Sequence, residues 1–89
     1  MKSNLPSRVD EAVNVLFDKV PDKEQDAIAK MPEHKMLALH EGLGMWVRNN
    51  FGLWAGNEDL LADTGALDPD GASAVIVRTF WERLRRRCP

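Results

Sequence analysis

The chain has 89 residues, a length typical of one domain. Its hydrophobic content of 44% and charged content of 29% are ordinary for a globular protein, and a formal net charge of −2 gives no overall attraction to nucleic acid or an anionic membrane. The single cysteine, Cys88, has no partner for an intrachain disulfide, and no apolar run is long enough for a signal peptide or a transmembrane helix. We therefore expect a cytoplasmic protein in which residues 1–89 form a single helical domain.

Two helices are predicted in the first third of the chain. Ser7 with Asp10 three residues later resembles a capping box at the start of the first helix, and Pro21 ends it. A short second helix is expected to be capped by Asp22, and Pro32 either ends it or begins the next one. The apolar stripe of the first helix consists of Val9, Ala12, Val13, Leu16, Phe17 and Val20.

The third predicted helix is the longest of the first three and runs from about Glu33 to Phe51. Gly44 and Phe51 lie at the edge of its apolar face, with Arg48 a little further round. Gly52 is expected to stop this helix in the left-handed conformation. At 100° per residue, the predicted face contains Met36, Leu39, His40, Leu43, Trp46, Val47 and Asn50.

The last part of the chain predicts two more helices. Asn57 is expected to cap a short acidic helix that ends at Gly65. Asp68 as N-cap and Pro69 as the first helical residue then begin a helix that runs to about Arg86. The predicted buried face of that helix consists of Ala72, Ile76, Val77, Phe80 and Leu84. The fold class predicted for the whole chain is therefore all-α, a compact small domain of about five helices, two of them short.

A central run of residues resembles a family of small uncharacterised bacterial domains. The run is Leu39-His40-x-Gly42-Leu43-Gly44-Met45-Trp46-x-Arg48-Asn49-Asn50-x-Gly52-Leu53-Trp54, followed by Asp68-Pro69-Asp70 before the final helix. The resemblance covers about residues 36–84, and Gly71 stands where a second acid is expected. Because that family has no assigned activity, the resemblance implies fold and boundaries but no function.

His40 is the first candidate for chemistry. Its place on the apolar face predicts a structural, buried and neutral imidazole that is hydrogen-bonded to a neighbour. No Ser, Cys or acid is spaced to form a catalytic triad with it. His34 lies about 240° round the same helix, so the two histidines are not expected to share a metal. The glycines form no phosphate loop, and we expect neither a metal nor a cofactor.

The polar residues near two tryptophans carry the leading functional hypothesis. An Arg beside two amides and two indoles has the composition of an interaction hot spot, and equally that of a small polar pocket. The predicted binding residues are Gly44, Trp46, Arg48, Asn49, Asn50 and Trp54. We expect a non-enzymatic module that binds a protein partner or self-associates, with Gly44, Arg48 and Trp54 forming one contiguous site. In the structural interpretation, Arg48 instead pairs with Asp63 or Asp70.

Two alternatives remain from other functional classes. One is a small-molecule or enzymatic site around His40, Arg48, Asn49 and Trp54, which predicts a concave pocket, whereas a protein-binding site predicts a convex apolar patch with an Arg. The other is nucleic-acid binding through the segment Arg83–Arg87, which the negative net charge disfavours. A purely structural role is predicted for His40, Gly52, Asp68 and Pro69.

Overall fold

The computed structural model describes residues 5–87, and all the regular structure in that range is helical. The elements in chain order are α1 (Val9–Lys19), α2 (Asp22–Ala29), the 3₁₀ turn η1 (Glu33–Lys35), α3 (Met36–Leu39), the π-helical turn η2 (His40–Gly44), α4 (Met45–Asn50), α5 (Glu58–Thr64) and α6 (Pro69–Arg87). The run from η1 to α4 is continuous, and we call it the long helix. Counted in this way, residues 5–87 form five helices, of which α2 and α5 are short, so the all-α prediction is confirmed. Cys88 lies outside the described residues.

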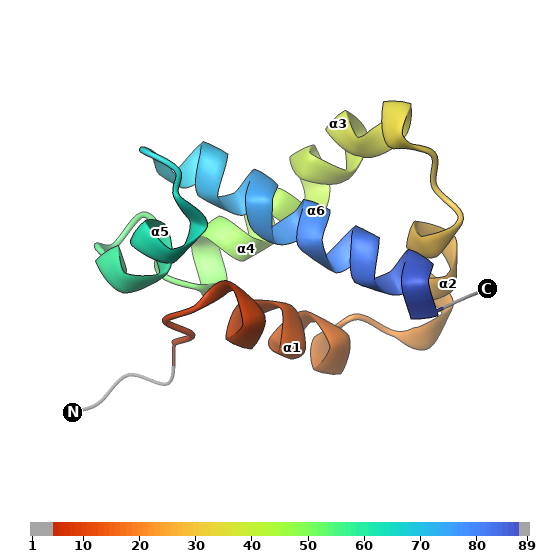
Figure 1. Ribbon diagram of the computed structural model, residues 1–89, viewed down its shortest axis with the longest axis horizontal. Helices are drawn as coiled ribbons and strands as arrows, with labels where there is room; N and C mark the ends of the chain where they lie inside the picture. The colour runs from red at the N-terminus through yellow and green to blue at the C-terminus, as the bar shows by residue number, and fades with distance from the viewer. Residues whose placement is uncertain (1–4, 88–89) are drawn as a thin grey trace.

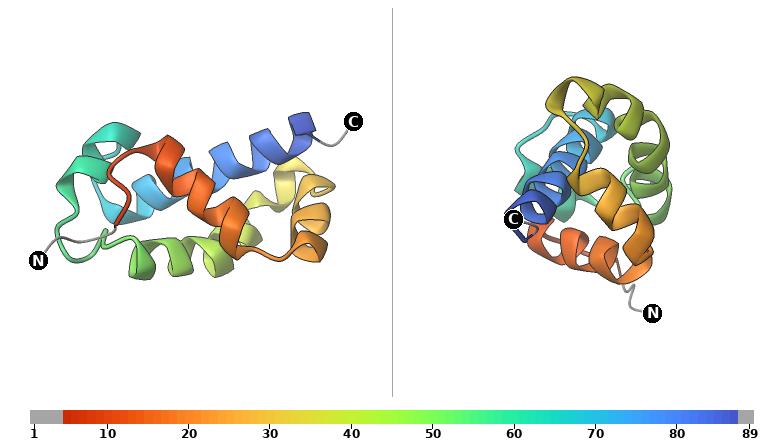
Figure 2. Two further views of the ribbon diagram at one scale, coloured as in Figure 1. Left: turned by 90° about the horizontal axis from the view of Figure 1, so that it is seen from below. Right: turned by 90° about the vertical axis from the view of Figure 1, so that its right-hand side faces the viewer.

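Helix α6 is the central element of the fold. Figure 1 shows it crossing the middle of the molecule, with α1 on one side and α3 on the other. It packs against α1, α2, α5 and the long helix. In the right-hand view of Figure 2, which looks along the longest axis, α6, α1 and the long helix surround a common centre. The buried apolar side chains of the domain gather there.

The core is built mainly from one face of α6. Ala72, Ile76, Val77, Phe80 and Leu84, the five residues predicted for that face, have no solvent-exposed area. The stripe of α1 meets them, and the rings of Phe17 and Phe80 make an edge contact with centroids 5.0 Å apart. Trp81 is also buried and donates its indole N–H to the carbonyl of Met31, which fixes the loop after α2 against α6.

The capping box predicted at Ser7 is wrong, because the N-cap of α1 lies one residue further along the chain. Its N-cap position is Arg8, which makes no side-chain cap, so Asp10 falls inside the first turn. Ser7 donates from its backbone N–H and its hydroxyl to Glu11 instead. The first helical N–H, that of Val9, donates to the carboxylate of Asp63 on α5, 2.8 Å away. The cap of α1 therefore comes from a residue 54 positions along the chain.

The short helix α2 also starts differently from the prediction. Pro21 holds the N-cap position and Asp22 is the first helical residue, so Asp22 is not the cap. Because α2 ends at Ala29, Pro32 does not terminate it, and instead precedes η1. Buried Gln25 donates to two carbonyl oxygens at the end of α1 and so ties α1 to α2.

The π-helical turn η2 changes which residues of the long helix face the core. In a π turn the N–H of residue i+5 bonds to the carbonyl of residue i. Each residue therefore turns through a smaller angle about the helix axis than in an α turn. Asn50, predicted on the buried face, is therefore exposed, whereas Phe51, predicted at the edge, is buried. Gly44, also predicted at the edge, is buried. Rotation of α4 relative to α3 is the physical reason for all three differences.

The predicted stop of the long helix is confirmed. Gly52 has a φ of +72°, and the N–H of Leu53 donates to the carbonyl of Arg48 at 3.3 Å, the long bond of a Schellman motif. Asn57 caps α5 through the N–H of Leu60, and α5 ends at left-handed Gly65.

Candidate functional site

Three residues of the long helix form a row that faces α6. The π turn keeps His40, Gly44 and Arg48, spaced four apart, on the same side of the helix. A Cβ placed on Gly44 would lie 3.4 Å from Nη1 of Arg48 and 3.6 Å from Oγ of Ser73. The missing side chain of Gly44 thus gives the guanidinium of Arg48 room between the long helix and α6.

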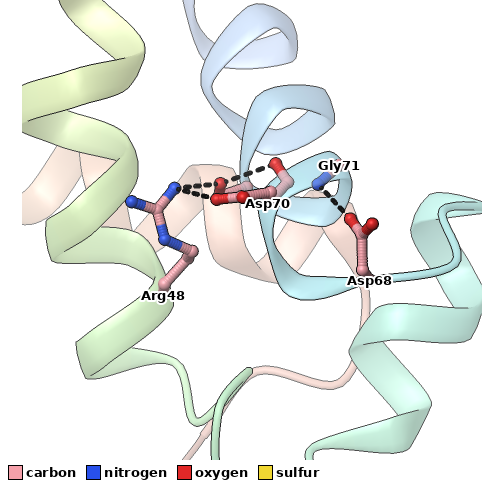
Figure 3. A network of polar contacts seen from close by, with 5 residues as sticks. Arg48, Asp68, Asp70 and Gly71 are labelled. Carbon is pink, nitrogen blue, oxygen red and sulfur yellow. Dashed lines mark hydrogen bonds and ion pairs between the residues drawn. The ribbon is translucent and has the colours of Figure 1, made fainter.

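The Arg48 guanidinium is held by the first turns of α6. Its Nη1 donates to Oγ of Ser73 at 2.9 Å and lies 3.2 Å from Oδ1 of Asp70 (Figure 3). The Ser73 hydroxyl in turn donates to the backbone carbonyl of Asp70. The Arg48 side chain is 14% exposed and that of Asp70 is 78% exposed, so the ion pair has one shielded and one solvated partner. Of the two acids considered for Arg48, Asp70 is the partner, because Asp63 caps α1.

The start of α6 orients Asp70 toward the long helix. Asp68 accepts a hydrogen bond from the N–H of Gly71 at 2.8 Å, and Pro69 is the first residue of the helix (Figure 3). The N-cap and first-residue roles predicted for Asp68 and Pro69 are therefore confirmed. This cap fixes the first turn that carries Asp70, and Ser73 lies one turn further along.

Trp54 lies on the solvent side of Arg48. The guanidinium carbon of Arg48 is 5.8 Å from the centroid of the indole, within the range of a cation–π contact. The indole remains 62% exposed. Gly44, Arg48 and Trp54 therefore lie together, and Arg48 makes both the indole contact and the ion pair that the sequence analysis treated as alternatives.

A small pocket opens beside this arginine. Its volume is about 260 Å³, and its lining is formed by Leu37, His40, Glu41, Arg48, Asp70 and Ser73. Leu37 is exposed, and Met45 is another exposed apolar residue three positions before Arg48. The region thus combines a shallow hollow with exposed apolar side chains around one cation.

His40 borders this pocket, and its burial and hydrogen bonding differ from the prediction. Its ring is half-buried, and Nε2 is shielded from solvent but has no hydrogen-bond partner. The predicted hydrogen bond is therefore wrong at this nitrogen, because the nearest polar group on its row, Arg48, is directed to Ser73 and Asp70. Burial lowers the pKa of His40, and the positive charges of Arg78 and Arg48 lower it further. These causes favour the neutral imidazole.

The other predicted binding residues lie elsewhere. Trp46 faces away from Arg48 and packs edge-on against Phe51, with ring centroids 5.5 Å apart. Asn50 donates to the carbonyl of Trp46 in its own helix, and Asn49 is exposed outside the lining of the pocket. Ser73 was missed by the sequence analysis. Its position beside Ala72 on the apolar face of α6 could have indicated a site residue, because a buried hydroxyl requires a hydrogen-bond partner.

The arginines near the end of α6 are largely occupied by contacts within the chain. Arg83 pairs with Asp10 of α1. The guanidinium of Arg85 lies 4.8 Å from the Trp81 ring, and that of Arg87 lies 4.7 Å from the Phe17 ring. These contacts weaken the case for a phosphate-binding segment over Arg83–Arg87.

Residues 5–87 also bear on two other classes of site, metal centres and membrane spans. No group of three or more His, Cys, Asp or Glu side chains is placed to hold a metal ion within that range. None of the helices described there has the length and apolar character needed to cross a bilayer.

Comparison with known proteins places the chain in a family. A family model described as Domain of unknown function (DUF6794) matches residues 5–84. The chain belongs to this family. The resemblance seen over about residues 36–84 is thus confirmed as one to a family without assigned function, and the match extends it through α1 and α2. No curated protein and no solved structure matches the chain.

Gly71, which stands where a second acid is expected after Pro69-Asp70, has a local steric explanation. A Cβ at this position would lie 3.1 Å from Cβ of Ala66 and 3.2 Å from the carboxylate of Asp68. A side chain there would crowd the cap that Asp68 forms.

Proposed function

We propose that this DUF6794 chain is a small, cytoplasmic, non-enzymatic module of bacterial origin that binds a protein partner, or a second copy of itself. The surface that we propose is formed by Leu37, Met45, Arg48 and Trp54, and we call it the Arg48–Trp54 surface. Its three apolar side chains provide exposed area around one arginine, the composition in which interface hot spots are enriched.

The observation that carries the proposal is the exposed indole of Trp54 above a positioned arginine. A large aromatic side chain left 62% exposed gains little for folding. Arg48 beneath it is already ordered by Ser73 and Asp70, so less side-chain entropy is lost when a partner covers the pair. Preorganisation of this kind favours recognition over a purely structural role.

The pocket beside Arg48 bears on both the protein-binding and the small-molecule hypotheses. At about 260 Å³ it is smaller than the roughly 300–1,000 Å³ of most small-molecule sites. It is suited to one side chain of a partner that lies across Trp54. A small-molecule site around His40 and Arg48 remains the second candidate, supported by the concave shape of this pocket.

Affinity capture with matched variants tests the proposal. The tagged chain, Trp54→Ala and Leu67→Ala are each used to retain proteins from the source cell, and self-association is measured by sedimentation. Leu67 is a suitable control because it is 97% exposed and lies outside the proposed surface. We expect Trp54→Ala to lose the retained protein, or the dimer, while Leu67→Ala keeps it. Equal behaviour of the two variants would contradict the proposal.

A further inference from the structure

A second, larger cleft lies on the other side of the long helix. It has a volume of about 600 Å³ and lies between that helix and the α1–α2 corner. Both α2 and the long helix pack on α6, and the cleft separates them. Its lining residues are Lys19, Val20, Pro21, Glu24, Ala27, Ile28, Leu39, Gly42, Leu43 and Trp46.

The two walls of this cleft are helix faces. On the long helix the lining positions are Leu39, Gly42, Leu43 and Trp46, which lie on one side of the helix with the π-helical turn η2 between the first and the last. On α2 the lining residues include Ala27 and Ile28. A groove walled by two helices presents ridges and hollows at helical spacing, the form that accepts the apolar face of a third helix.

Gly42 leaves open space in the wall that the long helix forms. It lies in a helix, where glycine is unfavourable, yet a Cβ at this position would meet nothing within 4 Å. Neither a positive φ nor a close neighbour within the described residues accounts for this glycine. A bulky side chain from outside the chain can therefore approach the backbone there.

The rim of the groove carries one charge of each sign. Lys19 and Glu24 are both exposed and line the cleft. The ion pairs within residues 5–87 involve other side chains, so both rim charges are available to a partner. An amphipathic helix with an acid and a base flanking its apolar stripe complements this rim.

We propose that the cleft binds an amphipathic helix of a protein partner, with a large apolar side chain seated over Gly42 and with its acid near Lys19 and its base near Glu24. This site lies on the face of the long helix opposite Arg48, and it stands independently of the function proposed above.

NMR titration of the isotope-labelled full chain tests this site. The probe is a helix-forming peptide of about 14 residues, roughly 21 Å long, with Leu at i, i+3, i+4 and i+7, one Asp and one Lys. A peptide of the same composition with its leucines scattered around the helix is the control. We expect the striped peptide to shift the indole signal of Trp46 and the amide signal of Gly42, and to bind at least about tenfold more tightly than the scattered one.

Matched variants separate the cleft from the rest of the surface. Gly42→Leu fills the open space beside residue 42 and is expected to weaken binding of the striped peptide at least about tenfold. Ala27→Lys places a charge on the opposite wall of the cleft and is expected to weaken binding of the striped peptide independently. Ala62→Leu adds the same side chain at an exposed position of α5 and is expected to leave binding of the striped peptide unchanged.

Three results would overturn the proposal. One is the absence of Trp46 and Gly42 shifts at millimolar striped peptide. Another is shifts produced by decanoate while the peptide gives none, which would indicate an acyl-chain site. The third is Trp46 shifts that follow protein concentration without any peptide, which would indicate a second copy of the chain in the groove.

Discussion

Arg48 is a shielded cation with one solvated partner, and this combination determines how it responds to substitution. The exposed end of its ion pair, Asp70, limits the electrostatic gain, and the shielded Nε of Arg48 has no hydrogen-bond partner. Lysine keeps the charge but loses the planar contact with Trp54 and the directed bond to Ser73. We expect Arg48→Lys to lower the free energy of unfolding by about 1 kcal/mol.

Urea unfolding measures this loss, with Arg86→Lys on the exposed end of α6 as the control. A loss well above about 2 kcal/mol would mean that Arg48 is mainly an internal structural pair. In that case the proposed binding role of Arg48 should be abandoned.

The lowered pKa of His40 predicts how the stability of the fold changes in mild acid. Its pKa in the folded chain is lowered from 6.5 by burial and by two arginines, so the unfolded chain takes up the proton first as pH falls. The free energy of unfolding should therefore decrease as the pH falls below about 6.5. Glu33, whose pKa is lowered by Arg78, is protonated only at lower pH and does not contribute in this range.

Unfolding at about pH 7.5 and pH 5.5 measures the contribution of His40. We expect His40→Met to lose less stability over this interval than the wild type, because it has no proton to take up. Leu67→Ala, which changes an exposed residue that does not titrate, should behave like the wild type. If His40→Met loses as much as the wild type, His40 does not titrate as described.

At the scale of elements, the sequence predicted faces well where helical geometry is regular and poorly where it changes. The face of α6 from Ala72 to Leu84 follows an unbroken α-helical period, and all five apolar residues predicted for it are buried, although buried Ser73 was not predicted. The long helix contains a π turn, and a pattern of apolar residues does not reveal an i+5 bond. Asn50 was therefore placed on the buried face and Phe51 at its edge, whereas the turn leaves Asn50 exposed and Phe51 buried.

Local chemistry predicted the helix ends better than the side-chain partners. Gly52, Asn57 and Asp68 act within a few residues of their own positions, so spacing alone was sufficient. The contacts of Arg48 with Ser73 and of Asp63 with Val9 join residues 25 and 54 positions apart. Such pairs depend on how the helices pack, which no local pattern specifies.

The stop of the long helix provides a prediction with an internal control. Gly52 and Gly65 both have a φ above +70°, so alanine is strained at either position. A Cβ on Gly52 would also lie 2.6 Å from Cδ1 of Leu5, whereas one on Gly65 would meet nothing within 4 Å. That methyl is the end of an exposed side chain and can move aside, so we expect Gly65→Ala and Gly52→Ala each to cost about 1–2 kcal/mol in thermal unfolding, from the backbone strain that they share. A much larger loss at Gly52 would show that Leu5 is held closely on this turn.

At the scale of the whole molecule, contacts from distant residues join the helices around α6. Asp63 on α5 accepts the first N–H of α1, a bond that joins the N-terminal and fourth helices of the fold. Removal of a helix cap costs about 1 kcal/mol, so we expect Asp63→Ala to lower the free energy of unfolding by that amount. Asp63→Asn keeps an acceptor oxygen and should lose less. Hydrogen exchange at Val9 should quicken in Asp63→Ala and would stay unchanged if the cap were unimportant.

The two faces of the long helix give the molecule two separate surfaces around one core. The Arg48–Trp54 surface combines a cation with exposed apolar side chains, whereas the cleft at Gly42 is apolar with charges only at its rim. Because Arg48 and Trp46 point to opposite sides of α4, substitutions on one face should leave binding at the other unchanged.

Photocrosslinking in the source cell tests most directly whether the Arg48–Trp54 surface binds a protein. A benzophenone amino acid replaces exposed Met45, which is part of this surface, and in a parallel chain replaces exposed Leu67, which lies outside it. We predict a discrete adduct with one protein, or with a second copy of the chain, from position 45, none from position 67, and loss of the adduct when Trp54→Ala is added. The same adducts from both positions, or none from position 45, would contradict a protein-binding role for this surface.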